Sequence, residues 1–339
     1  MLKYISKFPE SIIKIDESDF EKAAMAIFEY QFKNNLIYNQ YCMSLGKTPD
    51  DVSSIKFIPF LPIEFYKNHE VKSGVWKAEK IFESSGTTGG NTSSNQIKKL
   101  KDYFEISGSA FKLFYGNPSD YVILALVPSY VEQGNSSLIS MIDHFLSFNP
   151  NSESGYFLYN HDELIALLID LKEKGEKKVI LMGVTYALLD LAEKVNMEFP
   201  DLIIMETGGM KGRRKELTRV EIHEALNLAF GTSTIHSEYG MTEMMSQAYS
   251  LGKGLFRTPP WVRVFTREIN DPLSLEKQGA LGVINWIDLG NLNTCSFIAT
   301  SDLGRAYEDG SFEVLGRMDN SDIRGCNLMV VDDTDTVTD

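Results

Sequence analysis

The spacing of apolar residues changes twice along the chain. Up to about residue 75 they stand three and four positions apart, as in "DESDFEKAAMAIFEYQFKNNLIYNQYCMSLG", which predicts amphipathic helices. The "IKFIPFLPIEFYK" that follows reads as extended, because its two prolines exclude a helix interior. From Lys77 short apolar runs alternate with helical segments, and after about residue 255 the helical spacing stops.

The middle of the chain alternates strands with helices. Apolar runs at 122–128, 179–184 and 202–205 each adjoin a helical segment such as "DELIALLIDLKEKG", which is typical of a parallel or mixed sheet covered by helices. After residue 255 the runs are strand-like, and Asp309-Gly310 between two alternating runs predicts a β-hairpin. We therefore expect an α/β fold of mixed sheets flanked by helices, with a β-rich C-terminal part.

These changes divide the chain into four segments. We expect an N-terminal helical lobe at 1–75, an α/β core at 76–255, a β-rich part of the same domain at 256–330 and an acidic tail at 331–339, where the composition predicts disorder. The chain has 339 residues, more than a single core usually holds, which fits one large domain with an appendage or two domains.

Composition and charge exclude several classes of partner. With 43% hydrophobic and 24% charged residues the chain is typical of a soluble globular protein, and no apolar run reaches the roughly 18 residues that span a bilayer. The formal charge of −14 argues against nucleic acid and membrane surfaces, and the basic clusters at 97–101 and 211–215 read as solvated. Cys42, Cys295 and Cys326 have no C-x-x-C spacing, so we expect neither disulfides nor a zinc site, and a cytoplasmic location.

The segment "FESSGTTGGNTSS" at 82–94 is the first candidate site. It lacks the lysine of the Walker loop and the spacing of the dinucleotide fingerprint. It follows the predicted strand "EKIFESS" and precedes a helix expected near Ile97, so its amides and hydroxyls are suited to phosphate oxygens. The alternative is a solvated linker. The candidate phosphate ligands are Ser84, Ser85, Gly86, Thr87, Thr88 and Gly89.

Two later segments carry candidate nucleotide ligands. In "HSEYGMTEMMS" a ring at Tyr239 can lie against a purine, the Thr242 hydroxyl can reach a phosphate and the Glu243 carboxylate can hold Mg²⁺, although the same residues also suit a helix start. In "TSDLGRAYEDGSFEVLGRMD", Asp302 can accept both hydroxyls of a ribose and Arg317 can donate to ribose or phosphate, although both also fit a turn and a hairpin end. Three weak motifs in this order indicate a nucleotide site.

In this order the motifs resemble those of the adenylate-forming superfamily, which includes acyl-CoA synthetases, peptide-synthetase adenylation domains and luciferases. Within it the chain is most similar to the LuxE-like acyl-protein synthetases of bacterial bioluminescence. The resemblance extends from about residue 57 to 330. It rests on "IPFLPIEFYK", "ESSGTTG", "PSYVEQGNSSLISMI", "TGGMKGRRKEL", "SEYGMTEMMSQAYS", "PPWVRV" and "RGCNLM".

The resemblance implies a role for each candidate residue. Tyr239 and Gly240 would border the adenine of ATP, and Thr242 would contact its α-phosphate. Glu243 would hold Mg²⁺, Asp302 the ribose, and Arg317 would close the nucleotide site. Gly208 and Gly209 would form the far wall of the adenine pocket, although they also fit a plain strand-to-helix turn.

The chain departs from the superfamily in two ways. It reads "NTSS" where many members carry Pro-Lys after the phosphate loop, and it ends thirteen residues after Cys326, so we expect the small mobile C-terminal domain to be absent or vestigial. LuxE-like proteins share this truncation, and a cysteine near their C-terminus accepts the acyl group. Cys326 stands at the matching place, and the alternative is a small buried hydrophobic residue.

The resemblance therefore implies an ATP-dependent acyl-adenylating ligase that transfers an acyl group to a protein thiol. The cofactors would be ATP and Mg²⁺, the substrate a carboxylic and by family likeness a fatty acid, and the next partner an acyl reductase or an acyl carrier protein. Two alternatives remain: a phenylacetate-type acyl-CoA ligase, and a catalytically idle nucleotide-binding scaffold subunit.

Overall fold

The computed structural model describes residues 2–84, 92–128, 134–150, 153–208 and 217–318. Its N-terminal part is mostly helical, as the spacing of apolar residues predicts. Buried and exposed residues alternate with helical period along the longest of these helices, which buries Phe20, Ile27 and Phe28. The helices are α1 (Leu2–Ser6), α2 (Glu10–Ile13), α3 (Phe20–Asn34), α4 (Leu36–Ser44) and α5 (Phe65–Asn68).

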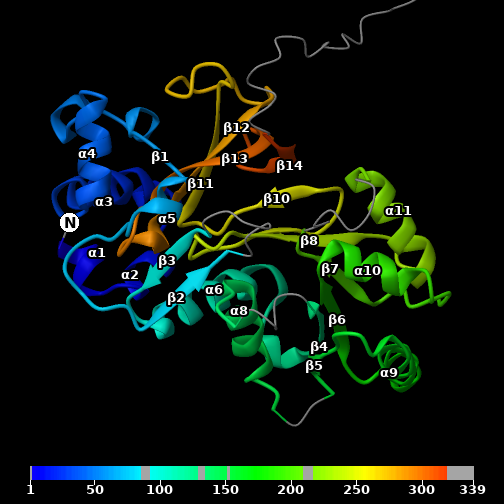
Figure 1. Cartoon of the computed structure of the whole chain (residues 1–339). Helices are drawn as coiled ribbons and strands as arrows, with labels where there is room; N and C mark the ends of the chain where they lie inside the picture. Colours follow the sequence, from blue (N-terminus) through cyan, green and yellow to red (C-terminus); the bar gives the residue numbers. More distant parts are fainter. Residues whose placement is uncertain (1, 85–91, 129–133, 151–152, 209–216, 319–339) are drawn as a thin grey trace, which may run out of the picture.

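A mixed sheet of twelve strands dominates the described part of the chain (Figure 1). Its order is β11-β12-β13-β14-β10-β9-β8-β7-β6-β4-β5, and β1 pairs with β13 beside this path. The strands are β1 (Leu61–Pro62), β4 (Tyr121–Leu126), β5 (Gly155–Tyr156), β6 (Lys178–Gly183), β7 (Ile203–Glu206), β8 (Ile235–Tyr239), β9 (Ala248–Ser250), β10 (Leu255–Arg257), β11 (Val262–Arg267), β12 (Gly282–Asp288), β13 (Phe297–Ala306) and β14 (Phe312–Arg317).

The direction of pairing changes at β8. Strands β4 to β8 pair in parallel, and from β9 onward the neighbouring strands are antiparallel. All residues of strand β4 are buried, as expected of a parallel strand covered on both faces. The sheet therefore combines a helix-covered parallel part with the β-rich part that follows residue 255. The α/β fold class and its β-rich C-terminal part are confirmed.

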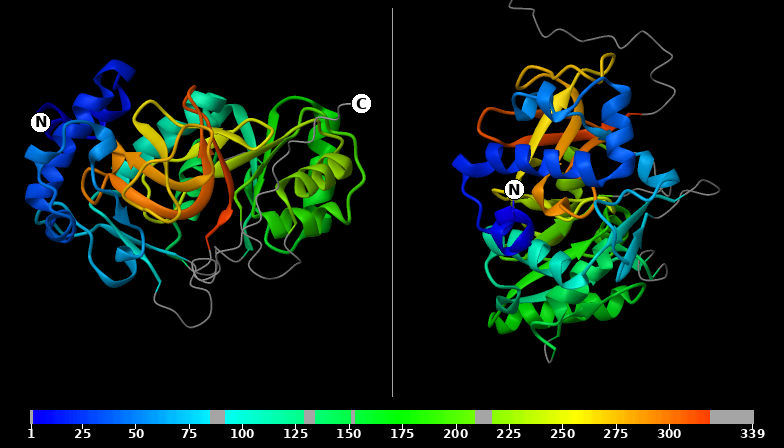
Figure 2. Two further views of the ribbon diagram at one scale, coloured as in Figure 1. Left: turned by 90° about the horizontal axis from the view of Figure 1, so that it is seen from above. Right: turned by 90° about the vertical axis from the view of Figure 1, so that its left-hand side faces the viewer.

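Helices cover both faces of β8. His236 lies 3.0 Å from the Tyr115 hydroxyl of α6, whereas the next residue, Ser237, faces Glu206 and the α11 side. Seen from above, the N-terminal helices lie at one end of the molecule and α9 to α11 at the other (Figure 2). The helices of this part are α6 (Leu100–Tyr115), α8 (Ser137–Leu146), α9 (His161–Lys174), α10 (Thr185–Ala192) and α11 (Arg219–Phe230).

A separate two-stranded sheet carries the candidate phosphate loop. Strands β2 (Lys80–Glu83) and β3 (Ser94–Ile97) pair antiparallel, with Glu83 opposite Ser94. The helix expected near Ile97 is α6, which begins three residues later at Leu100, because residues 94–97 form β3. Asn95 and Ile97 are both buried, which is the alternation of a strand. The candidate loop therefore closes a hairpin.

The extended reading of residues 55–67 was only partly right. The segment contains the short strand β1, but a 3₁₀ turn precedes it at Ile55–Phe57 and α5 follows it. The helix begins after Pro62, so both prolines lie outside its interior, as their missing N–H groups require. The main-chain N–H of Ile63 donates to the Ala299 carbonyl, so this segment is held against β13.

Candidate active site

A chain of polar contacts links β8, β13 and β14. The Tyr239 hydroxyl donates to Oδ2 of Asp302 over 2.8 Å, and Nε of Arg317 lies 3.3 Å from Oδ1 of the same carboxylate. Pairing of β13 with β14 places Asp302 opposite Arg317. Asp302 is buried, whereas the Arg317 side chain is 71% exposed. The polar chain therefore runs from the interior to the surface.

The ring of Tyr239 is buried among aromatic residues. Its centroid lies 5.9 Å from that of Phe256 and 5.7 Å from those of Trp286 and Phe312, in edge-on or tilted arrangements. Burial, and then the Asp302 carboxylate, raise the pKa of Tyr239 well above its usual range. The hydroxyl therefore keeps its proton and stays a donor to Asp302.

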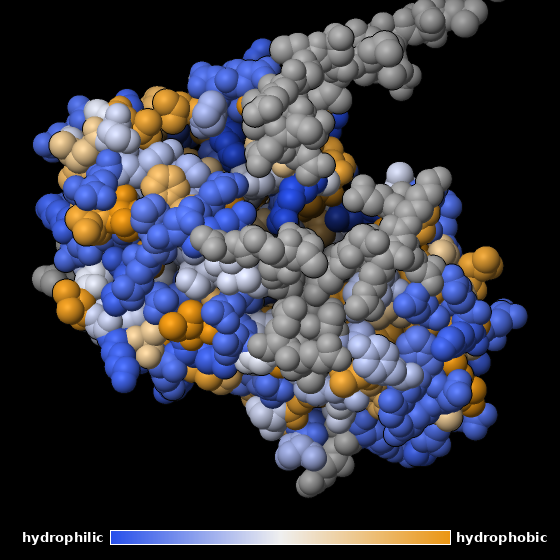
Figure 3. All heavy atoms as spheres, viewed as in Figure 1, coloured by the Kyte–Doolittle hydropathy of each residue, from blue (hydrophilic) through white to orange (hydrophobic). Residues whose placement is uncertain are grey.

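Gly240 leaves the backbone next to this ring open to solvent. The residue is exposed, and a Cβ added to it would come within 2.6 Å of Oε1 of Glu238 and 3.3 Å of Cγ of Gln247. Any other residue here would push these side chains aside. The molecular surface is hollowed between the β-rich part and the part around α11 (Figure 3).

The segment after Gly240 is a turn held by two buried amides. Nδ2 of Asn95 donates to the Thr242 carbonyl over 3.0 Å, and Nδ2 of Asn291 donates to the Glu243 carbonyl over 2.6 Å. The structure has no helix at 240–247, so the alternative reading of this motif as a helix start is wrong. The main chain of Thr242 and Glu243 is held from β3 and from the 3₁₀ turn that follows β12.

The same turn meets the base of the candidate phosphate loop. Ser84 donates its N–H to the Ser93 carbonyl, and its Oγ accepts from the Ser93 N–H, both over 3.0 Å. Burial raises the pKa of Glu243. A hydrogen bond from Ser93 and the positive charges of Arg317 and Lys67 oppose this rise. Glu243 is 5% exposed. Glu243 therefore lies next to Ser93, which is bonded to Ser84, and within the electrostatic reach of Arg317.

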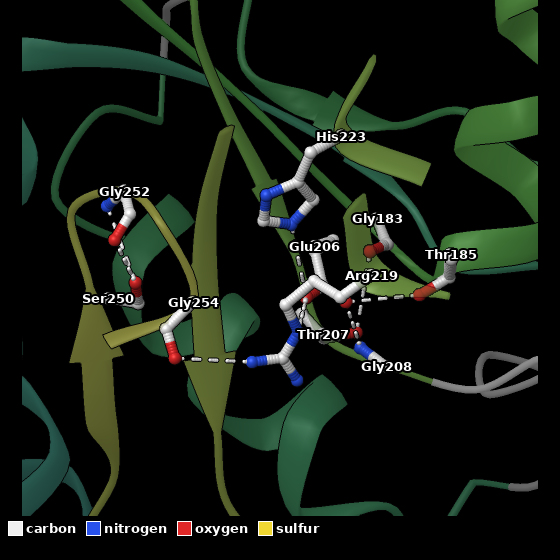
Figure 4. Close-up of polar contacts among 10 residues, drawn as sticks. All are labelled: Gly183, Thr185, Glu206, Thr207, Gly208, Arg219, His223, Ser250, Gly252 and Gly254. Atoms are coloured by element: carbon white, nitrogen blue, oxygen red, sulfur yellow. Dashed lines mark hydrogen bonds and ion pairs between the residues drawn. The ribbon is translucent and has the colours of Figure 1, made fainter. Parts of the chain in front are cut away.

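Gly208 lies in the turn after β7, whose geometry is set by Glu206 (Figure 4). Oε2 of Glu206 accepts from the Gly208 N–H over 2.9 Å and from the Thr185 hydroxyl over 3.0 Å. The Thr185 N–H donates to the Gly208 carbonyl over 3.2 Å. Gly208 has φ +73°, and a Cβ there would meet no atom within 4 Å, so the turn has an open side.

The buried carboxylate of Glu206 is ionised. Burial alone would raise its pKa, but His223, Arg219, Ser237 and the Gly208 N–H outweigh burial and lower the pKa to about 2. On α11, Nε of Arg219 lies 3.9 Å and Nε2 of His223 lies 3.8 Å from Oε1 of Glu206. Both contacts are longer than hydrogen bonds, and the permanent charge of Arg219 acts on the carboxylate across this distance.

Sequence reasoning missed both glutamates of β7 and β8. Glu206 stands just before the Gly208 turn and Glu238 just before Tyr239, each at the carboxyl end of a parallel strand, where the ligands of α/β sheets bind. Burial, and then the charge of Glu206, raise the pKa of Glu238 to about 8. For Glu206, a carboxylate at the end of an otherwise apolar strand was the available signal.

The structure brings together most of the candidate residues that it describes. Tyr239, Asp302 and Arg317 form one group, and Ser84 and Glu243 meet at Ser93. Thr242 and Gly240 lie in the turn between them, and Gly208 ends the strand next to β8. Seven further candidates lie outside the described residues: Ser85, Gly86, Thr87, Thr88, Gly89, Gly209 and Cys326.

Within the described residues, no group of three or more His, Cys, Asp or Glu side chains is placed to hold a metal ion. None of the helices in that part of the chain is both long and apolar enough to cross a bilayer. Cys42 and Cys295 are buried, and burial raises the pKa of the Cys42 thiol to about 12 and that of Cys295 further, so neither is a ready nucleophile.

Solved structures of adenylate-forming ligases share this fold. A 2-hydroxyisobutyryl-CoA ligase in complex with 2-HIB-AMP and CoA matches with a TM-score of 0.60 at 15% identity, covering 90% of this chain and 70% of that one. ATP-bound MatB from Rhodopseudomonas palustris matches with a TM-score of 0.51 at 17% identity, covering 70% of this chain and 47% of that one. The chain thus spans about half of MatB. It has the fold of adenylate-forming ligases.

The family follows from the sequence. The profile described as "Acyl-protein synthetase, LuxE" matches residues 12–334, nearly the whole chain. The chain belongs to this family. None of the curated proteins matches it.

Proposed function

We propose that the chain activates a carboxylic acid with ATP and transfers the acyl group to Cys326. In the first step a carboxylate oxygen of the acid attacks the α-phosphorus of ATP, and pyrophosphate leaves as acyl-AMP forms. In the second, the Cys326 thiolate attacks the acyl carbon, a thioester forms and AMP leaves. The thiol proton passes to the solvent.

The observation that carries this proposal is the polar chain from Tyr239 through Asp302 to Arg317. The Asp302 carboxylate has a bond to the protein at each oxygen and retains lone pairs for the two hydroxyls of a ribose. Arg317 extends from it toward the solvent, where a phosphate can pair with the guanidinium. Membership of the LuxE family supports the same assignment.

We assign the nucleotide's Mg²⁺ to Glu243. Magnesium on a nucleotide commonly takes one or two protein carboxylates and completes its octahedron with phosphate oxygens and water, so a single carboxylate fits. Glu243 lies beside Ser93 at the base of the phosphate loop. The bound ion would neutralise charge on the phosphates, and Thr242 would contact the α-phosphate.

The remaining assignments are proposals of the same kind. Tyr239 and Gly240 on one side, and Gly208 with Gly209 on the other, border the adenine. The acid is a medium or long-chain fatty acid, by likeness to the family. An acyl reductase or an acyl carrier protein receives the acyl group from Cys326.

The test measures exchange of labelled pyrophosphate into ATP over a panel of short, aromatic and long-chain acids. We expect acid-dependent exchange that EDTA abolishes, and that Asp302→Ala lowers at least tenfold. If none of the acids supports exchange while calorimetry still detects ATP binding, the result would contradict adenylation and indicate the idle scaffold.

Cys326→Ser separates the two steps. This variant should keep pyrophosphate exchange within about twofold of the wild type and lose acid-labelled protein on denaturing gels, because the adenylate forms without the thiol. Cys42→Ser is the matched control and should keep the label, since this thiol is buried. A label that persists in Cys326→Ser, or consumption of free CoA by the wild type, would contradict the assigned acceptor.

A further inference from the structure

We propose that Glu206 is a positioning residue that sets the separation between the two walls of the adenine pocket. This inference rests on the proposed function, because the walls at Gly208 and at Tyr239 are assigned there. It concerns residues behind the pocket that no candidate motif contains. The argument follows the contacts of the two carboxylate oxygens in turn.

One oxygen of Glu206 fixes the wall at Gly208. Oε2 holds the Gly208 N–H at 2.9 Å and the Thr185 hydroxyl at 3.0 Å. Two main-chain bonds join the turn after β7 to the turn after β6: Thr185 N–H to the Gly208 carbonyl at 3.2 Å, and Thr207 N–H to the Gly183 carbonyl at 3.0 Å. The backbone at Gly208 is therefore held from β6 as well as from β7 (Figure 4).

The other oxygen faces α11. Nε of Arg219 and Nε2 of His223, one turn apart on the helix, lie 3.9 and 3.8 Å from Oε1. Helix α11 begins with a capping box, in which the Glu221 carboxylate accepts from the N–H and hydroxyl of Thr218 at 2.7 and 2.8 Å. The cap fixes the start of the helix, and Glu206 fixes its position against β7.

Arg219 continues the connection to the wall at Tyr239. Its guanidinium lies over the Phe256 ring, 5.1 Å from the centroid, and Nη1 donates to the Gly254 carbonyl over 3.4 Å. The Phe256 ring contacts that of Tyr239 at 5.9 Å. A continuous set of contacts thus runs from Gly208 through Glu206, Arg219 and Phe256 to Tyr239. It passes behind the place where a flat base would lie.

The contact between Glu206 and Arg219 requires the negative charge of the Glu206 carboxylate. A neutral glutamine has an amide oxygen that still accepts from Gly208 or Thr185, but it does not attract the Arg219 guanidinium. A buried carboxylate is costly unless it is paired, and here Arg219 is the permanent cation that pairs it. Glu206→Gln therefore removes the link to α11 while retaining most of the turn.

The experiment compares ligands with and without a base. For Glu206→Gln we expect the Kd of ATP and of AMP, measured by calorimetry, to rise about tenfold, because a misplaced wall weakens contact with the base. The Kd of inorganic tripolyphosphate should stay within twofold. In pyrophosphate exchange the KM for ATP should rise in parallel and the KM for the acid should not.

Two variants complete the test. Arg219→Met keeps the hydrogen bonds of Glu206 to Gly208 and Thr185, and should reproduce the loss, with no further loss in the double variant. Glu224→Gln removes a carboxylate at an exposed position of the same helix, outside the cap and the connection, and should keep the wild-type Kd values. Circular dichroism verifies that each variant is folded.

Unchanged ATP affinity in Glu206→Gln would overturn the inference. So would an equal loss of ATP and tripolyphosphate binding, or an equal effect of Glu224→Gln, since either indicates a general loss of structure. A wild type that binds ATP but never exchanges pyrophosphate would overturn the proposed function alone, because the comparison of binding constants remains valid. A wild type that binds no nucleotide would overturn both.

Discussion

Two glutamates at the ends of neighbouring strands have opposite protonation in this site. Burial alone would raise the pKa of Glu206, but contacts with His223 and Arg219 of α11 and a backbone N–H outweigh burial, so its pKa falls to about 2. Glu238 lies on the other face of the sheet, and burial with the charge of Glu206 raises its pKa to about 8. At neutral pH one is a carboxylate and the other a carboxylic acid.

Glu238→Gln should change how stability depends on pH. The folded pKa of about 8 exceeds the unfolded value near 4.5, so the folded protein binds the extra proton between these values and loses stability as pH rises from 4.5 to 8. The Glu238→Gln variant has no carboxyl group at this position, so it does not lose this stability as pH rises. We expect equal free energies of unfolding in urea near pH 4.5 and a more stable variant at pH 8; curves that stay parallel would refute the shifted pKa.

At the scale of residues, the sequence pointed to the candidate ligands and not to the residues that contact them. Asp302 and Arg317 were recognisable because they stand in short polar motifs after apolar runs. Their contact with Tyr239 was not, because it joins positions 63 residues apart in the chain. Glu206 was missed because its partners, Arg219 and His223, lie on a later helix whose packing against β7 the sequence does not show.

At the scale of elements, the hairpin that holds the phosphate loop was the main surprise. The sequence "NQIKKLKDYF" has several good helix formers, and a four-residue strand is too short to show its period clearly. Pairing with β2 decides the conformation of residues 94–97, and propensity alone does not include such a partner. The Asp309-Gly310 hairpin, by contrast, was predicted correctly because its turn is local, with Gly310 at φ +78°.

Gly304→Ala should weaken both stability and nucleotide binding. A Cβ at Gly304 would overlap the Glu313 carbonyl oxygen of β14 and approach Cδ1 of Ile284 to 2.9 Å, so β13 and β14 would have to separate. These strands carry Asp302 and Arg317. We expect about 1–3 kcal/mol of destabilisation in urea and a higher KM for ATP.

The matched control for this prediction is Gly155→Ala on the edge strand β5. A Cβ there meets no atom within 4 Å, and the residue lies in the parallel part of the sheet. It should leave the unfolding midpoint and the KM for ATP close to the wild-type values. An equal effect of both substitutions would argue against the overlap as the cause.

At the scale of the whole molecule, the N-terminal helices are joined to the β-rich part by buried polar bonds. Nε2 of Gln31 donates to the Asn291 and Leu292 carbonyls over 3.0 and 3.1 Å, and Oε1 accepts from the Ser296 N–H over 2.9 Å. The Tyr38 ring stacks on Phe297 at 5.9 Å. The early helices are therefore part of the same core as the last strands.

Gln31→Leu should destabilise the protein by about 2–3 kcal/mol, because it leaves the Ser296 N–H and the Leu292 carbonyl without their buried partner, while the Asn291 carbonyl keeps the Thr294 N–H. Urea unfolding followed by tryptophan fluorescence measures the change. Gln40→Leu, at an exposed position of α4, is the control and should change stability by less than about 0.5 kcal/mol. A similar small effect at Gln31 would show that the lobe docks weakly.

Because α3 binds residues near 291, there is a delay during synthesis between the appearance of this helix and that of its partners. Gln31 and the Asn291 carbonyl that it binds are 260 residues apart. At roughly 5–20 residues per second, a ribosome needs roughly 10–50 s to make that interval. During this time the part of α3 and α4 that packs on the last strands has no docking surface, so we expect chaperones to occupy the emerging N-terminus until β13 has been translated.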